Sequence, residues 1–199
     1  MDEIQPGILH WTAFHEGIGS DVSSYYVVAG ATLIDPMVPP GGLAELAGAG
    51  RPERIVLTNR HHYRHSDRYV DTFGCTVMCH EAGLHEFAGG PAVEGFRFEE
   101  EIGPGIMALE VDAICAEETA LHIAAGEGIL AFADGLVRWD SGLGFVPDGL
   151  LGEDPEAVKQ ALQEAYRRLL ERDFDSLLFA HGNPIIGGGR RALEAFLAG

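Results

Sequence analysis

The eleven residues from Thr58 to Arg68 limit the fold and chemistry of this chain more than any other segment. They hold three of its nine histidines and three arginines, and they directly follow an apolar, strand-like run over residues 54–57. A strand end holds the backbone that follows it rigidly, and neutral imidazoles are good ligands for zinc-like ions. Arginine opposes a metal ion at the same place, because it is a permanent cation with no lone pair to donate. The functional question is which of these two tendencies prevails.

Composition excludes several classes of function. The chain has 199 residues, 46% of them hydrophobic, which predicts a single domain over residues 1–199 with a sizeable core. Its 13 basic and 31 acidic side chains give a net charge of −18, so we expect no nucleic-acid partner and no contact with an anionic membrane surface. The beginning of the sequence lacks the features of a secretory signal, and no run approaches membrane-spanning length. We therefore expect a cytoplasmic protein.

The order of apolar runs indicates an α/β protein. β-Branched and aromatic runs predict strands at residues 8–15, 22–28, 31–34, 55–58, 76–79, 106–111, 114–115, 120–124, 129–132 and 177–180. Helices are predicted at residues 43–47, 66–73 and 190–197, and an amphipathic helix with Val158, Leu162, Ala165 and Leu169 on one face follows Asp154. Residues 135–152 read as a long glycine-rich loop.

Polar residues cluster just past the predicted strands. His62 and His65 follow one strand, Asp134 follows a second, and His181 follows the last, while Glu118 lies in a turn between two strands. Active-site residues of α/β proteins concentrate at such places, because rigid strands aim them while the loops stay accessible. These five residues are therefore candidates for one site.

The order of elements, the run from Ser23 to Val28 and the following Leu33-Ile34-Asp35-Pro36 resemble the metallo-β-lactamase fold superfamily over nearly the whole chain. The resemblance implies a four-layer αβ/βα sandwich with a metal site along one edge. Members of that superfamily are mostly zinc- or iron-dependent hydrolases and oxidoreductases. Their hallmark is a His-x-His-x-Asp-His box after a strand, then a lone His, a bridging Asp and a final His in a His-Gly pair.

Two registers place this box on the sequence. Matching from His65-Ser66-Asp67-Arg68 puts Arg60, His62, Arg64 and His65 on the four box positions, so that the first His and the Asp have both become arginine. Counting from Thr58 instead gives Asn59, His61, Tyr63 and Arg64, which preserves even less. Further along, Glu118 resembles the place of the lone His, Asp134 the bridging Asp, and His181-Gly182 the final pair.

The arginines argue against the family's two-metal site. One metal position keeps only His62, with Glu118 as a substitute oxygen ligand, whereas the other keeps His65, Asp134 and His181. A guanidinium about 5 Å from a divalent ion would repel it by roughly 6–7 kcal/mol at an effective dielectric near 20. We therefore expect one zinc or iron ion at most, or none.

Three interpretations follow. The first is a hydrolase with an altered site, in which His62, His65, Asp134 and His181 hold the ion and Arg60 or Arg64 steadies a developing oxyanion. The second is a metal-free, catalytically inactive protein that binds a small anionic ligand or a protein partner through an Arg/His pocket, with Arg60 and Arg64 paired to Asp134 and Glu118. In that case the glycines before Arg190 could add backbone N–H groups to the pocket. The third is a structural or assembly role. The sequence assigns no substrate.

Overall fold

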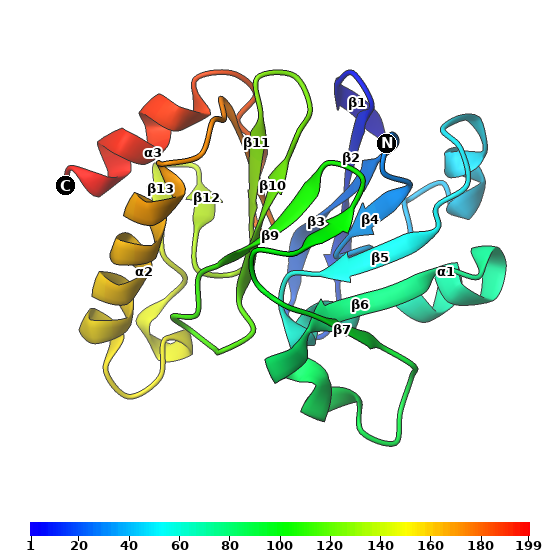
Figure 1. Cartoon of the computed structure of the whole chain (residues 1–199), viewed down its shortest axis with the longest axis horizontal. Helices are drawn as coiled ribbons and strands as arrows, with labels where there is room; N and C mark the ends of the chain where they lie inside the picture. The colour runs from blue at the N-terminus through cyan, green and yellow to red at the C-terminus, as the bar shows by residue number, and fades with distance from the viewer.

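A computed structural model describes all residues from 1 to 199, and it contains two main β-sheets packed face to face (Figure 1). The first sheet has seven strands in chain order: β1 (Asp2–Gln5), β2 (Ile8–His15), β3 (Ser20–Val27), β4 (Thr32–Ile34), β5 (Arg54–Leu57), β6 (Thr76–His80) and β7 (Glu94–Phe96). Strands β1 to β4 pair antiparallel, and β4 to β7 pair parallel.

The second sheet has five strands in the spatial order β14 (Ser176–Phe179), β11 (Ile129–Phe132), β10 (Thr119–Ile123), β9 (Ile106–Glu110) and β8 (Glu101–Gly103). Only the β11–β14 pair is parallel. A separate hairpin, β12 (Val137–Trp139) and β13 (Gly142–Gly144), lies within the segment predicted to be a loop. The prediction missed it because its strands are short and interrupted by glycine.

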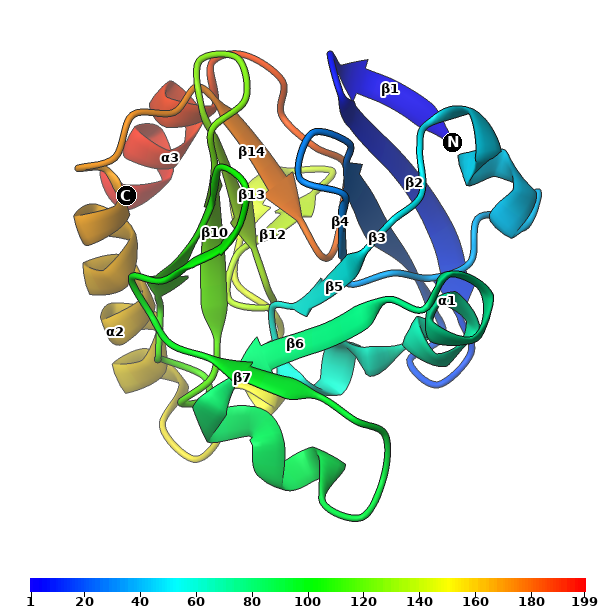
Figure 2. The ribbon, with the colours of Figure 1, turned by 45° about the vertical axis from the view of Figure 1, so that its right-hand side comes forward.

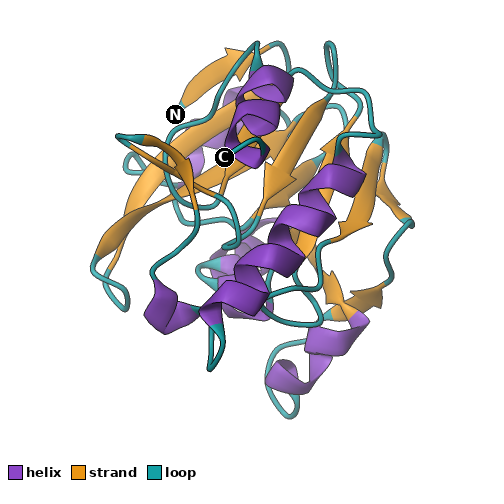
Figure 3. Ribbon diagram, turned by 90° about the vertical axis from the view of Figure 1, so that its left-hand side faces the viewer, coloured by secondary structure: helices purple, strands orange, loops and turns teal.

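Helices cover the outer face of each sheet. On the second sheet lie α2 (Pro155–Leu169) and α3 (Gly189–Leu197), which Figure 3 views from their own side. The outer side of the first sheet carries α1 (Ser66–Phe73) and two 3₁₀ helices, η1 (Leu43–Gly48) and η3 (Glu81–Phe87). Figure 2 shows α1 and the pair α2 and α3 at opposite sides of the molecule, with both sheets between them. Two further short 3₁₀ helices are η2 (Arg60–Tyr63) and η4 (Asp148–Leu150).

Three apolar clusters fill the spaces between these layers. One lies between the sheets and includes Ile34, Val56, Leu121 and Leu178. A second joins the five-stranded sheet to α2 and α3, and the third joins the seven-stranded sheet to α1, η1 and η3. Burial of apolar surface on both faces of each sheet stabilises the arrangement. The predicted four-layer αβ/βα sandwich is therefore confirmed.

Most of the predicted elements are present. Helix α1 has the predicted bounds, and α2 begins where Asp154 Oδ1 accepts a hydrogen bond from the Ala157 N–H, with Pro155 in the first turn. The predicted strand at residues 114–115 is wrong. Those residues belong to a turn, which the Glu118 N–H closes by donating to the Cys115 carbonyl.

The sheets bring several strand ends to one edge of the sandwich. Because β4 and β5 are parallel neighbours, Asp35 and Thr58 follow them side by side, and parallel β11 and β14 place Asp134 and His181 similarly. The Thr119 N–H donates to the Thr58 carbonyl at 3.0 Å and joins the two sheets at this edge. None of the helices is both long and apolar enough to cross a membrane.

Candidate metal centre

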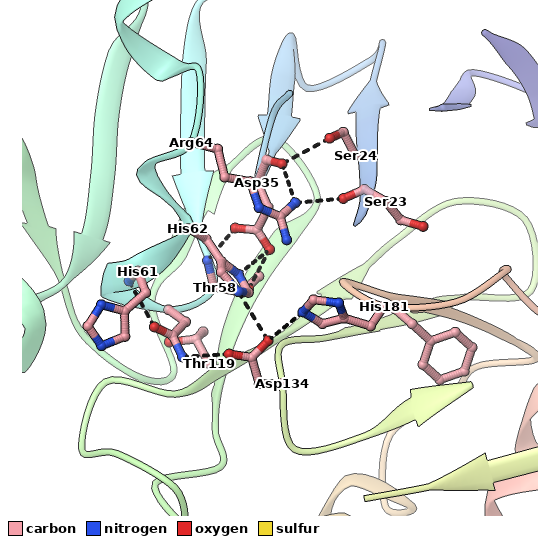
Figure 4. Close-up of polar contacts among 12 residues, drawn as sticks. Ser23, Ser24, Asp35, Thr58, His61, His62, Arg64, Thr119, Asp134 and His181 are labelled. Atoms are coloured by element: carbon pink, nitrogen blue, oxygen red, sulfur yellow. Dashed lines mark hydrogen bonds and ion pairs between the residues drawn. The ribbon is translucent and has the colours of Figure 1, made fainter. Parts of the chain in front are cut away.

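His62 lies at the centre of the predicted site and is held from both sides. Its ring is buried, with Nδ1 3.0 Å from Asp35 Oδ2 and 3.1 Å from Thr58 Oγ1. Its Nε2 atom lies 3.1 Å from Asp134 Oδ1 (Figure 4). Short helix η2 aims the ring inward, and Asn59 caps that helix by accepting a hydrogen bond from the His61 N–H. The imidazole thus bridges two carboxylates.

Asp134 contacts residues that follow strands of both sheets. Its Oδ1 atom lies 3.1 Å from Nε2 of His62 and 3.1 Å from Nε2 of His181, and its Oδ2 atom accepts a hydrogen bond from Asn59 Nδ2 at 3.2 Å. The potential ligand atoms of His62, Asp134 and His181 all lie within 4.8 Å of one another. No other group of three such side chains is this close. The structure therefore brings three of the four predicted metal-ligand residues together.

The protonation states in this cluster are set mainly by His62 and its two carboxylates, and Arg64 adds to the lowering of the Asp35 pKa. Burial lowers the pKa of His62, but Asp134 and Asp35 outweigh it and raise the pKa to about 9. Burial opposes ionisation of Asp134, yet the charge of His62 and hydrogen bonds from His181 and His62 hold its pKa well below the usual range. The pKa of Asp35 is likewise lowered by His62 against the effect of burial. A protonated His62 between two carboxylates is thus stable in the absence of an ion.

His65 lies outside this cluster. Its Nδ1 atom accepts a hydrogen bond from the Val38 N–H at 3.0 Å, and its own N–H donates to the Pro36 carbonyl at 3.2 Å. The cause is Arg64, whose φ of 46° and ψ of −117° turn the chain sharply between His62 and His65. His65 therefore packs against the segment after β4, while His62 takes the central place.

The predicted partners of the two arginines are wrong. Arg64 is half-buried, and its Nη1 atom donates to the backbone carbonyls of Ser23 at 2.8 Å and Asp35 at 2.7 Å (Figure 4). Arg60 pairs with Glu117 and lies 3.9 Å from Glu86. Neither guanidinium pairs with Asp134 or Glu118. The repulsion expected between Arg64 and an ion is also weakened, because Arg64 is bound to carbonyl oxygens beside the anionic Asp35.

Glu118 faces away from the cleft. It is 1% exposed, and its carboxylate accepts hydrogen bonds from the Gly135 N–H at 2.7 Å and the Ile114 N–H at 3.2 Å. Burial raises its pKa to about 7, although these N–H groups act in the opposite direction. Since it reaches neither His62 nor His181, it is not part of the ligand cluster.

The glycines before Arg190 also lie elsewhere. The Gly189 N–H donates to the Asp175 carbonyl, and the Gly187 N–H donates to Ser176 Oγ, at the start of β14. His181 follows the opposite end of that strand. These N–H groups therefore cannot contribute to an anion pocket at the site.

An open cleft of about 1320 Å³ leads to the cluster, and His62, Asp134 and His181 all line it. Three of its lining residues are exposed apolar side chains from three different segments, namely Ile18 in the turn after β2, Trp139 at the end of β12 and Leu150 at the end of η4. Arg138 lines the cleft beside His181, and no carboxylate pairs with its guanidinium. The cleft therefore offers apolar surface next to polar groups, as small-molecule sites commonly do.

Sequence reasoning missed three residues that support the cluster, namely Asp35, Thr58 and Asn59. Thr58 donates to Asp35 through both its N–H, at 2.9 Å, and its hydroxyl. Asp35 directly follows a buried strand, so the strand-end signal used for Asp134 could have found it. Asn59 occupies the first box position in the register counted from Thr58, whereas His62 occupies a box position in the register matched from His65. The site therefore contains a box residue from each of the two registers.

Comparisons with known proteins identify the fold. No protein-family model matches the sequence, and no curated protein matches it. Metallo-beta-lactamase family protein TTHA1429 from Thermus thermophilus superimposes with a TM-score of 0.68 at 17% identity, over 98% of this chain and 80% of that one. TTHA1623 in a di-iron-bound form gives a TM-score of 0.67 at 21% identity, over 93% and 96% of the two chains.

A third match is the archaeal metallo-beta-lactamase superfamily protein ST1585 from Sulfolobus tokodaii. It has a TM-score of 0.63 at 14% identity, over 96% of this chain and 85% of that one. At such identities a match defines the fold. The chain has the α/β metallo-β-lactamase fold, as its resemblance to that superfamily predicted.

Proposed function

We propose that the protein is a hydrolase that binds a single divalent metal ion through His62, Asp134 and His181. The observation that carries the proposal is the convergence of three donor atoms, two imidazole Nε2 atoms and one carboxylate oxygen, within 4.8 Å. The proteins with matching folds include several described as metallo-beta-lactamases, which supports hydrolysis as the reaction class. The substrate is not assigned.

The chemistry of the donor set fits a zinc or iron ion. Two histidines and one carboxylate serve both catalytic zinc sites and non-haem iron sites, and they leave coordination positions open. The second nitrogen of His62 is hydrogen-bonded to Asp35, as expected for a metal ligand whose orientation is fixed by a carboxylate. A bound ion of this kind supplies Lewis acidity and lowers the pKa of water to near neutrality.

The surroundings favour one ion over two. The second oxygen of Asp134 already accepts a hydrogen bond from the Asn59 amide, which competes with bridging to another ion. His65 and Glu118, which were candidate ligands in the sequence, are hydrogen-bonded elsewhere. The only group of three donors within bonding reach is therefore the one already described.

The chain's own residues would orient the reaction. Asp35 and Thr58 fix the His62 ring, and Asn59 fixes the Asp134 carboxylate. The apolar rim formed by Ile18, Trp139 and Leu150 would contact an apolar part of the substrate and exclude water from it.

The metal-free alternative is a protein that binds a small anion in the same cleft and catalyses no reaction. It is favoured by the raised pKa of His62, since a protonated imidazole offsets part of the charge of Asp35 and Asp134 without an ion. It is disfavoured by Arg60 and Arg64, because both guanidinium groups already have protein partners. Arg138, which donates to the Pro184 carbonyl and has no carboxylate partner, would be the main guanidinium left to bind the anion.

Metal content separates the two proposals. Tag-free protein is purified, stripped with a chelator, and titrated with Zn²⁺, Fe²⁺ and Mn²⁺ by calorimetry, with elemental analysis of the dialysed complex. The hydrolase proposal expects one equivalent of one of these ions. Less than about a tenth of an equivalent for all three ions would refute it and leave the anion-binding proposal.

A further inference from the structure

Glu118 is a buried carboxylate that the proposed function does not use. Its side chain is 1% exposed, no cationic group pairs with it, and it does not line the cleft. A charged group in this setting is costly, because it loses its hydration without gaining an opposite charge. Such a residue needs an explanation beyond packing.

The hydrogen bonds of Glu118 provide such an explanation. Oε1 accepts the Gly135 N–H at 2.7 Å, and Oε2 accepts the Ile114 N–H at 3.2 Å. Gly135 directly follows Asp134, so Glu118 holds the peptide that joins the central carboxylate to the rest of the chain. The Glu118 carboxylate thus contacts the peptide on the C-terminal side of Asp134.

The packing around Gly135, in the turn after β11, is also tight. A Cβ atom added at Gly135 would lie 2.5 Å from Glu118 Oε1, 2.5 Å from Tyr166 Oη and 2.6 Å from Leu162 Cδ2. Tyr166 is fully buried, and its hydroxyl has no hydrogen-bond partner. The turn after β11 is therefore clamped between Glu118 and α2, with room only for glycine.

We propose that Glu118 is a positioning residue for Asp134, which it holds through the Gly135 N–H so that Oδ1 of Asp134 faces both His62 and His181. This inference rests on the proposed function, because its purpose is to prepare Asp134 as a metal ligand. Asp134 contacts two imidazoles through the same oxygen, so a small rotation of its peptide would break one of these contacts.

The test uses Glu118→Gln, which keeps the shape but offers one acceptor where two N–H groups need one each. Loss of an outer residue that orients a ligand typically weakens metal binding about 10- to 100-fold. We expect that increase in the Zn²⁺ dissociation constant, together with shifted absorption bands of the Co²⁺-substituted protein. Glu117→Gln is the matched control, because Glu117 is the adjacent buried glutamate and pairs with Arg60 instead of a peptide beside a ligand.

A metal-free readout keeps this inference separate from the proposed function. In ¹⁵N-labelled protein without metal, the ring nitrogen signals of His62 and His181 should shift in Glu118→Gln and stay in place in Glu117→Gln. Unmoved ring signals would overturn the role of Glu118, whether or not the wild type binds an ion. If the wild type binds no metal but the ring signals shift in Glu118→Gln, only the hydrolase proposal is overturned.

A second variant protects the test against a folding failure of Glu118→Gln. Gly135→Ala should displace the same turn, because the new methyl group would collide with Glu118 and Tyr166. It should produce the same changes in the ring signals and in Zn²⁺ affinity. Unchanged values in this variant would likewise contradict the proposal.

Discussion

The Nε2 atom of His62 lies 3.1 Å from the Oδ1 atom of Asp134, and this contact joins a residue that follows the first sheet to one that follows the second. Without an ion, the imidazole is a cation and the carboxylate an anion, and each stabilises the charge of the other. A metal ion would take the place of the proton on His62. Stability, metal affinity and pH are therefore linked through this pair.

The metal-free protein should lose stability as pH rises. The folded-state pKa of His62, about 9, lies above its ordinary 6.5, so its stabilising effect is complete below pH 6.5 and lost as pH passes 9. Between pH 7.5 and 9.5 we expect the free energy of unfolding to fall by about 2 kcal/mol, measured by urea denaturation with a chelator present. His62→Gln should abolish this dependence, and His122→Gln, which alters a histidine bonded to the Asp173 carbonyl, should retain it. A flat wild-type profile would contradict the charge pair.

Metal affinity should rise with pH over the same range. Binding requires the neutral imidazole, so each ion bound displaces the proton from His62 below pH 9. The association constant for Zn²⁺ should increase about tenfold per pH unit between pH 7 and 8.5. Calorimetry in buffers of different ionisation enthalpy would report the released proton, and release of none would show that His62 is not a ligand.

Asp134 should be indispensable for metal binding. Asp134→Asn keeps the size of the side chain but removes the charge that faces both imidazoles. We expect the Zn²⁺ dissociation constant to rise at least about 100-fold, equivalent to about 2.7 kcal/mol. Asp140→Asn changes an exposed carboxylate that also lines the cleft and should leave the constant within about twofold. Equal effects of the two variants would point to a diffuse electrostatic cause.

The fold could be predicted from the sequence because each layer has a local signal. The face of α2 that carries Leu162, Ala165 and Leu169 is buried as its periodicity requires, and α1 has its predicted bounds. The strand ends at Asp134 and His181 were visible as polar residues after apolar runs, and β11 and β14 do bring them together. Short-range patterns thus located the site along the chain.

The contacts within the site could not be predicted, because they depend on backbone conformation and on pairing between distant segments. Arg64 adopts a positive φ, which turns His65 away from His62, and an arginine gives no sequence signal for that conformation. Glu117 and Glu118 are adjacent, and one pairs with Arg60 while the other faces Gly135. Asp35 reaches His62 only because β4 and β5 are parallel neighbours.

Arg64 should stabilise the fold through its hydrogen bonds to backbone carbonyls. Its half-buried guanidinium donates to the carbonyls of Ser23 and Asp35, and Arg64→Met would leave both without that donor. We expect a loss of about 2–4 kcal/mol in the free energy of unfolding, measured by urea denaturation at pH 7. Arg68→Met, on the exposed side of α1, should cost less than about 0.5 kcal/mol. A cost for Arg64→Met as small as that of the control would show that its hydrogen bonds are not made in solution.

Gly182 should control the position of His181. Its φ of +97° lies in the region that favours glycine, and a Cβ atom there would collide with the Arg138 carbonyl. Gly182→Ala should therefore displace the turn that carries His181 and raise the Zn²⁺ dissociation constant at least about tenfold, since one ligand would be misplaced. Gly19→Ala is the matched control: Gly19 has a φ of +66° but open space around it, so this variant carries the conformational cost, about 1–2 kcal/mol, without the collision. If Gly182→Ala and Gly19→Ala lose similar stability but only Gly182→Ala loses Zn²⁺ affinity, the loss is due to displacement of His181. If the two variants have equal Zn²⁺ affinities, the turn at Gly182 does not determine the position of His181.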